Sequence, residues 1–330
     1  MVTLLTTTYT GNAMDESLIS DFSGAPLSPA INNKILSLYT RGMNNAEIQD
    51  ILRKSYHVLA PLSLLRTTTD SVLNDYQSWQ DGALERQYPI VYFDSLLVKF
   101  RLGADNRKLT VMFALGVDMQ GHKCPLGLWI TASESRQGWE TVIADLKQRG
   151  INDIFIACLY GQTGAHEALA KIFPQSQVQL CMVRLLDNSL NYVTWKDRKN
   201  AASALRLVYS SDTAAHAAEA MMRFMYERDE HYPAIEQLWH THWDQIAQLF
   251  KLPIPLREAI YSTIAIQSLH QSLAKASKRH GVFTNENDLL VRLYLSQHYL
   301  ARRWSQPLRH WKQVLNSLAI THENRLQIKF

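Results

Sequence analysis

One acidic residue stands inside an apolar, β-forming run, and this feature constrains the fold more than any other. The run is Tyr88-Pro-Ile-Val-Tyr-Phe-Asp94-Ser-Leu-Leu-Val-Lys99. Val, Ile, Tyr and Phe favour strands, and a buried strand rarely carries a lone carboxylate. Two interpretations are open. Asp94 either caps a neighbouring backbone group at the end of a strand or belongs to a functional site.

Apolar periodicity around this run predicts an α/β domain. Strands come first and alternating helices and strands follow, which implies a mixed sheet flanked by helices. A stretch rich in Ala, Met and aromatic residues then predicts an all-α insertion at about 183–255, followed by a late helix from Leu256 to His280. The elements expected before the insertion are strands at 89–100, 108–118 and 123–131, a helix at 135–149, a strand at 153–159, a helix at 165–173 and a strand at 177–181.

Residues 32–80 have the pattern of a small helical domain. Gly42 separates two apolar helical stretches, and Pro61 opens a third helix that is expected from Leu62 to Trp79. Such helices form either a helix-turn-helix-like DNA-binding domain or a plain three-helix bundle. In the first case the last helix directs polar side chains toward a DNA groove, and the candidates are Arg66, Thr67, Thr69 and Asp70.

Several further blocks carry a resemblance that runs from about Ile35 to the last few residues. They are Tyr88 to Lys99, Leu126-Gly-Leu-Trp129, Glu134-Ser135, Asp145-Leu-Lys-Gln-Arg-Gly150, Asp153-Ile-Phe-Ile-Ala-Cys158, Val178-Gln-Leu-Cys181, Asn188-Ser-Leu-Asn-Tyr-Val193, Lys196-Asp-Arg-Lys199 and Ala265-Ile266. In this order they resemble the catalytic domain of mutator-type bacterial insertion-sequence transposases, a DDE family with an RNase H-like fold. The resemblance implies a catalytic-type domain at 88–330. Through Leu38-Tyr-x-Arg-Gly-Met43 and Glu47-Ile-Gln49 it also favours DNA binding by the helical domain.

The resemblance implies a site for phosphoryl transfer on DNA. In the family, three carboxylates gather around two Mg²⁺ ions, one of which activates the attacking oxygen while the other stabilises the leaving oxygen. Asp94 matches the first acid. The second acid ends a strand, and the block here is Ile156-Ala-Cys-Leu-Tyr160-Gly161, so a phenol stands in its place. The third lies on a late helix, where Ser262-Thr-Ile264-Ala-Ile-Gln267-Ser-Leu269 supplies an amide at Gln267.

Neighbouring positions also depart from the family pattern. The family has Cys-x-x-His after its fifth strand where this chain has Cys181-Met-Val-Arg184, and a family Asn matches Ile264. Three carboxylates would offset most of the charge of two magnesium ions, whereas Asp94 alone offsets little and Tyr160 is a poor magnesium ligand. We therefore expect weak metal binding at Asp94 or none, no other cofactor, and no catalysis.

The end of the expected late helix is basic. Lys275, Lys278 and Arg279 lie in its last turns. They either complement the helix dipole or form a ridge that contacts DNA phosphates near the site, which Arg302-Arg303 and Arg309-His310 would extend.

The amino-acid composition constrains the function less than these motifs do. The net charge of +4 and pI of about 8.8 permit nucleic-acid binding without requiring it. Cys124, Cys158 and Cys181 are isolated in apolar stretches and are expected to be reduced core residues. The start of the chain lacks a cationic segment, and no run of 18 apolar residues occurs, so we expect a cytoplasmic protein with no membrane partner, associated with the nucleoid if it binds DNA.

Three functions remain open. The favoured one is a degenerate or domesticated transposase that binds transposon-end-like DNA without cutting it. The alternatives are an inhibitory partner that co-assembles with intact transposase copies, and an active transposase with unorthodox metal ligands. The protein partner is expected to be either a further copy of this chain, in a homo-oligomer, or an intact transposase. Residues 1–31 match nothing in the resemblance and are expected to form a loosely ordered tail, and the apparent lack of an upstream DNA-binding segment suggests a truncated or re-initiated reading frame.

Overall fold

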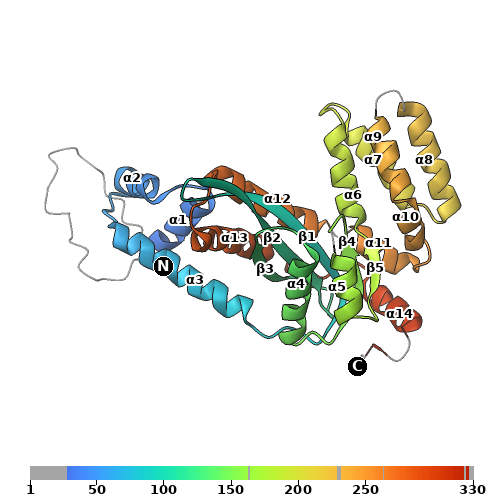
Figure 1. The fold of residues 1–330 in the computed structure, drawn as a ribbon, viewed down its shortest axis with the longest axis horizontal. Helices are drawn as coiled ribbons and strands as arrows, with labels where there is room; N and C mark the ends of the chain where they lie inside the picture. The colour runs from blue at the N-terminus through green and yellow to red at the C-terminus, as the bar shows by residue number, and fades with distance from the viewer. Residues whose placement is uncertain (1–27, 163, 229–231, 263, 323–324, 327–330) are drawn as a thin grey trace, which may run out of the picture.

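The computed structural model describes residues 28–162, 164–228, 232–262, 264–322 and 325–326. The tail expected at 1–31 falls mainly outside these residues, and the first helix begins at Pro29. A five-stranded sheet forms the centre of the molecule (Figure 1). Its strands are β1 (Gln87–Leu102), β2 (Asp105–Val117), β3 (Lys123–Thr131), β4 (Asp153–Leu159) and β5 (Gln177–Leu180).

The order of the strands places the end of β4 beside the middle of β1. That order is β3-β2-β1-β4-β5. The strands β1, β2 and β3 are antiparallel neighbours, whereas the β1–β4 and β4–β5 pairs are parallel. Tyr92 is paired with Cys158 near the end of β4, and Asp94 lies two residues further along β1. Tyr160, which follows β4, is therefore brought to the same region of the sheet as Asp94.

Helices cover both faces of the sheet, which explains the nearly continuous burial of the first half of β1. On one face, α4 (Arg136–Gln148) and α5 (Ala165–Ile172) pack over residues such as Phe93, whose ring meets Trp139 edge-on at 6.0 Å between centroids. The other face packs against α12 (Ala265–His280) and the helical insertion. The predicted fold class, an RNase H-like mixed sheet flanked by helices, is confirmed.

The helical insertion lies at the opposite end of the molecule from the N-terminal helices (Figure 1). The single late helix predicted from Leu256 to His280 is wrong, because the chain forms α11 (Ile254–Ser262) and then α12. Ser, Thr and Ile at 262–264 are weak helix formers, and the break places Gln267 in the first turn of α12. The other helices of the insertion are α6 (Met182–Ser189), the 3₁₀ turn η2 (Leu190–Tyr192), α7 (Arg198–Tyr209), α8 (Ala214–Arg228), α9 (Pro233–Thr241) and α10 (Trp243–Leu249). After α12 the chain forms α13 (Glu286–Ala301) and α14 (Trp311–Thr321).

Three N-terminal helices pack on α13 through one apolar cluster that includes Val291 and Leu295. They are α1 (Pro29–Thr40), α2 (Asn45–Tyr56) and α3 (Leu62–Gln80). A capping box between Asn44 and Glu47 fixes the start of α2. No helix in the described part of the chain is both long and apolar enough to cross a membrane.

Candidate functional site

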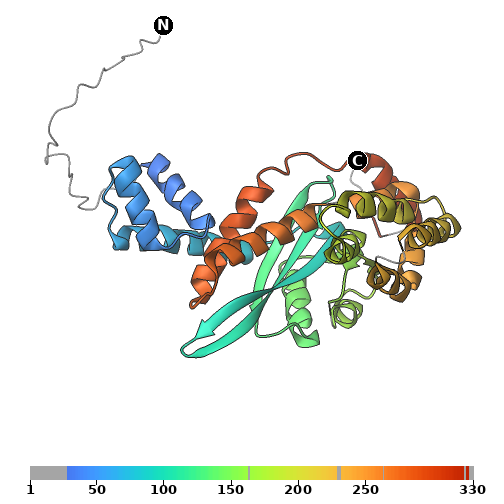
Figure 2. The ribbon, with the colours of Figure 1, turned by 90° about the horizontal axis from the view of Figure 1, so that it is seen from above.

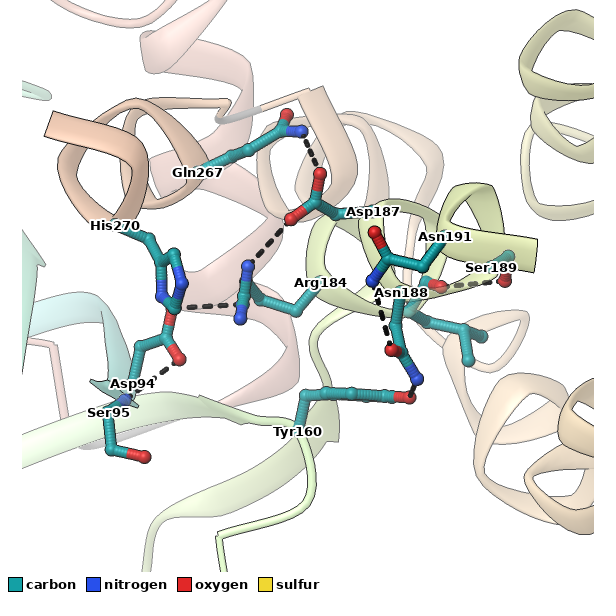
Figure 3. Close-up of polar contacts among 11 residues, drawn as sticks. Asp94, Ser95, Tyr160, Arg184, Asp187, Asn188, Ser189, Asn191, Gln267 and His270 are labelled. Atoms are coloured by element: carbon teal, nitrogen blue, oxygen red, sulfur yellow. Dashed lines mark hydrogen bonds and ion pairs between the residues drawn. The ribbon is translucent and has the colours of Figure 1, made fainter. Parts of the chain in front are cut away.

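Asp94 lies in the middle of β1 and is only 2% exposed. Its Oδ1 accepts a hydrogen bond from the backbone N–H of Ser95 at 2.8 Å. Its Oδ2 lies 2.9 Å from Arg184 Nε and 3.0 Å from His270 Nδ1 (Figure 3). The Arg184 contact is an ion pair by distance, although its Nε–H is not well directed at the oxygen. Asp94 therefore accepts a hydrogen bond from a neighbouring backbone group, although in the middle of a strand and not at its end, and also takes part in a long-range polar network.

Arg184 connects two carboxylates within this network. It lies in the first turn of α6, and its Nη1 is 2.8 Å from Asp187 Oδ2. The other oxygen of Asp187 accepts a hydrogen bond from Gln267 Nε2 at 2.7 Å. The side chains thus form a continuous chain from His270 through Asp94, Arg184 and Asp187 to Gln267 (Figure 3). We call these five residues the Arg184 network.

Tyr160 belongs to a separate polar cluster beside the Arg184 network. Its hydroxyl oxygen accepts a hydrogen bond from Asn188 Nδ2 at 2.5 Å, and its ring lies 5.7 Å from the ring of His242. In Figure 3 its side chain points toward Asn188 and away from Asp94. Burial raises the pKa of the Tyr160 phenol above the ordinary value for tyrosine, so the side chain stays neutral near pH 7.

Of the three positions matched to the family's acids, Asp94 and Gln267 are connected through Arg184 and Asp187. Tyr160 does not belong to the Arg184 network. The structure also brings in residues that sequence reasoning missed, namely Asp187 and His270. Both lie three positions from a residue singled out earlier, Asp187 after Arg184 and His270 after Gln267. Residues at this spacing share a helix face, and that is the signal that could have indicated them.

Two other positions assigned to this region have different surroundings. Cys181 is 1% exposed just before α6, and burial raises the pKa of its thiol to about 12. Ile264 is 58% exposed at the start of α12, so its side chain faces solvent more than the network.

The donor set of the site is poor in carboxylates. Asp94, Tyr160 and Gln267 supply one carboxylate, one phenol and one amide, and every oxygen of Asp94 already has a partner. Among the described residues, no group of three or more His, Cys, Asp or Glu side chains is arranged to hold a metal ion. What this arrangement can do is neutralise the buried Asp94 with a permanent cation.

Comparison with known proteins identifies the family. Residues 27–307 match the family described as transposase, mutator family. The chain belongs to the mutator family of transposases. It is 36% identical over 298 residues to the transposase for insertion sequence element ISRM3 from Rhizobium meliloti (strain 1021), covering 90% of this chain and 74% of that protein.

A second relative is covered almost in full. The chain is 34% identical over 315 residues to a probable transposase for an insertion sequence element from Corynebacterium diphtheriae, covering 89% of this chain and 92% of that protein. Among solved structures, the Drosophila P element transposase strand transfer complex matches at 11% identity and a TM-score of 0.35, covering 88% of this chain and 84% of that one.

The residues expected to contact DNA in this transposase-family chain fall into two groups. On α3, Arg66 and Thr67 are exposed and Thr69 is half-buried. The hydroxyls of Thr67 and Thr69 donate hydrogen bonds to carbonyl groups of α3 itself, at 3.0 Å and 2.8 Å. Arg66 and Thr69 line a pocket of about 470 Å³ that also contains the acidic residues Asp70 and Asp288. This face of α3 therefore has mixed charge.

The second group lies on α12, and its members occupy different faces of that helix. Lys275 and Arg279 line an open groove of about 770 Å³ between α1, α12 and α13, whereas Lys278 is exposed and does not line it. We call this the α12 groove. Its lining contains no acidic residue and consists of Asn33, Ser37, Thr40, Ser272, Lys275, Ala276, Arg279, Ser296, Tyr299, Leu300, Arg302 and Arg303.

Proposed function

We propose that this mutator-family chain binds DNA and does not catalyse its cleavage or joining. The observation that carries the proposal is the position of Arg184, whose guanidinium lies against both Asp94 and Asp187. A guanidinium stays charged at every pH the protein experiences. It therefore places one positive charge beside Asp94, the residue that matches the first metal-binding acid of the family.

The residues do not fit the magnesium pair of the family. Magnesium prefers oxygen ligands, above all carboxylates, and is repelled by a cation at the same carboxylate. Asp187 brings a second carboxylate near the site. Both carboxylates contact Arg184, so a metal would have to displace an ion pair whose Asp94 partner is buried.

DNA binding is supported by the α12 groove. Four basic side chains, Lys275, Arg279, Arg302 and Arg303, line it together with hydroxyl and amide groups. Lys and Arg pair with phosphate oxygens, and Ser, Thr, Asn and Tyr donate hydrogen bonds to them. We infer that the groove contacts the sugar-phosphate backbone. Lys278, on another face of α12, contributes less than the sequence suggested.

The test measures binding and cleavage in the same samples. Purified protein is mixed with labelled duplex DNA that carries transposon ends, and with supercoiled plasmid, in Mg²⁺ or Mn²⁺. We expect a shifted complex at low salt with no nicked or joined product. Nicking that is lost in Asp94→Ala would contradict the proposed loss of catalysis. Failure to bind any duplex at low salt would contradict DNA binding.

Groove variants test where the DNA lies. Because each phosphate contact releases a counterion, Lys275→Ala with Arg279→Ala should reduce the slope of log affinity against log salt by about 0.9 per contact, whereas Lys278→Ala should change it little. Arg66→Ala is expected to reduce discrimination between DNA sequences if α3 enters the major groove. An equal effect of Lys278→Ala and Lys275→Ala would assign the binding to overall charge instead of the groove.

A further inference from the structure

The strands β1 and β2 continue well beyond the rest of the sheet. Their pairing runs without interruption from Ile90 with Val117 to Leu102 with Asp105. β3 pairs with β2 only as far as Thr110, and β4 pairs with β1 only as far as Tyr92. Residues 99–108 therefore form a two-stranded ribbon, which projects from the body of the molecule in Figure 2. We call this segment the β-ribbon.

The β-ribbon has an unusual charge. It contains four basic residues and one acidic residue, a net charge of +3, in a chain whose total is +4. The four cations are Lys99, Arg101, Arg107 and Lys108. None of them lies in an ion pair with a carboxylate of the described chain.

The two faces of the β-ribbon differ. Side chains alternate along a strand, so the buried Val98 and Phe100 lie on one face. Arg107 lies on that face too, with its guanidinium 5.4 Å from the centre of the Phe100 ring. The opposite face is exposed and carries Lys99 and Arg101. Their cross-strand partners, Lys108 and Asn106, complete it.

Lys99 and Lys108 are directly opposite each other in the register. Like charges at such positions destabilise a sheet, and no acidic side chain in the described ranges forms an ion pair with either lysine. A fold retains an arrangement of this kind at little loss when a polyanion neutralises it. Lys, Arg and Asn together are also the side chains that contact phosphates and base edges.

We propose that the exposed face of the β-ribbon binds duplex DNA, with Lys99, Arg101 and Lys108 on the phosphates flanking one groove. The inference rests on the proposed DNA binding of the whole chain and adds a second contact surface to the α12 groove. The major groove is about 12 Å wide and admits a two-stranded ribbon.

The β-ribbon is held at a fixed place relative to α12. Arg101 donates its backbone N–H to Phe283 O at 2.7 Å, and Phe283 donates its N–H to Lys99 O at 3.1 Å. Phe283 follows α12 by three residues. One segment thus connects the β-ribbon to the helix that carries Lys275 and Arg279, so that a single duplex can meet both surfaces.

A different role for exposed lysines on a ribbon is to prevent pairing with another strand. The two roles make opposite predictions. If the lysines only prevent pairing with another strand, their removal causes self-association and leaves the DNA affinity of the monomer unchanged. If they bind DNA, their removal lowers affinity and leaves the monomer intact.

The experiment compares Lys99→Ala/Lys108→Ala with the matched control Lys251→Ala/Lys312→Ala, which removes the same charge from two exposed lysines elsewhere. Affinity for a labelled duplex is measured by fluorescence anisotropy over a salt series. We expect the ribbon variant to bind at least about 10-fold more weakly at low salt, with a log–log salt slope reduced by about 1.8, since each contact contributes about 0.9. The control should bind within about 2-fold of the parent.

Thermal unfolding and sedimentation separate the outcomes. The ribbon variant should unfold at the same temperature as the parent or a higher one, because a like-charge pair has been removed. Equal affinity of ribbon variant and parent would overturn the inference while leaving the proposed function standing. Loss of affinity in the control of the same size would also overturn it. A parent that binds no duplex at low salt would overturn both.

Discussion

The side chain of Arg184 holds together a network that contains two carboxylates, of which Asp94 is buried and Asp187 partly exposed. Replacing it with alanine leaves Asp94 buried and without its guanidinium partner. We expect Arg184→Ala to reduce the free energy of unfolding by about 3 kcal/mol, because removing one member of a buried ion pair leaves an uncompensated charge. Urea denaturation monitored by tryptophan fluorescence measures this change.

A double variant is the matched control for this prediction. Asp94→Leu with Arg184→Met replaces the pair with apolar side chains, a change that is often close to neutral. The double variant should therefore be more stable than Arg184→Ala alone. The opposite order of stability would show that the two side chains do not act as a pair.

We expect that metal binding at this site would require more than two added acids at positions 160 and 267. Tyr160→Asp with Gln267→Glu supplies carboxylates but leaves the guanidinium in place. We expect Mg²⁺ to raise the thermal midpoint only when Arg184→His is added, because a ligand that binds the native state stabilises it. Differential scanning fluorimetry over a magnesium series tests this. A midpoint shift in the acid double variant that is as large as in the triple variant would mean that Arg184 does not obstruct the site.

For single residues, the sequence indicated some members of the Arg184 network and not others. Asp94 was conspicuous because a carboxylate inside a β-forming run is rare, and Gln267 and Arg184 because they depart from a family pattern. Asp187 and His270 neither interrupt an apolar run nor depart from a family pattern. Asp187 pairs with Arg184 within α6, but its contact with Gln267 and that of His270 with Asp94 join different elements, and only the packing of α6 and α12 on β1 creates them.

Among the elements, the turn between α1 and α2 shows how closely the N-terminal helices approach α12. Gly42 has a φ of +88°, and a Cβ added there would lie 2.7 Å from Arg279 Cβ. Gly42→Ala should therefore destabilise the protein by about 2 kcal/mol or more, from backbone strain and from the clash combined. Chemical denaturation and DNA affinity should both change, because Arg279 lines the α12 groove.

Gly103 provides the control for this prediction. It also has a positive φ, +61°, but a Cβ there would meet no atom within 4 Å. Gly103→Ala should show the backbone strain alone, about 1–2 kcal/mol. If the two variants lose equal stability, the contact between Gly42 and α12 contributes nothing.

Local patterns predicted most elements to within a few residues and failed where pairing or packing decides. Strands were expected at 89–100 and 108–118, whereas β1 extends to Leu102 and β2 begins at Asp105. The polar residues between them resemble a loop, but cross-strand pairing around a two-residue turn keeps them extended. The prediction of one late helix was wrong because weak helix formers at 262–264 interrupt a stretch that is otherwise helical. There the sequence pattern predicted too long an element, whereas in β1 and β2 it predicted strands that were too short.

For the whole molecule, one alternative is an inhibitor that co-assembles with intact transposases. Our proposal predicts a different kind of inhibition, namely competition for DNA. Added to an active relative, the protein should lower strand transfer at limiting DNA, and excess DNA should restore it. Inhibition that persists at excess DNA, with a stoichiometric mixed complex in sedimentation, would support co-assembly instead.

Direct observation of a bound divalent cation would decide whether the chain retains the chemistry of its family. Free Mn²⁺ gives a six-line electron paramagnetic resonance signal that weakens when the ion binds to protein. We expect the signal of Mn²⁺ at micromolar concentration to be unchanged by an excess of this protein, with or without DNA, and equal to that obtained with Asp94→Ala. A signal that falls in proportion to added protein, and recovers with Asp94→Ala, would contradict the proposed loss of the metal site.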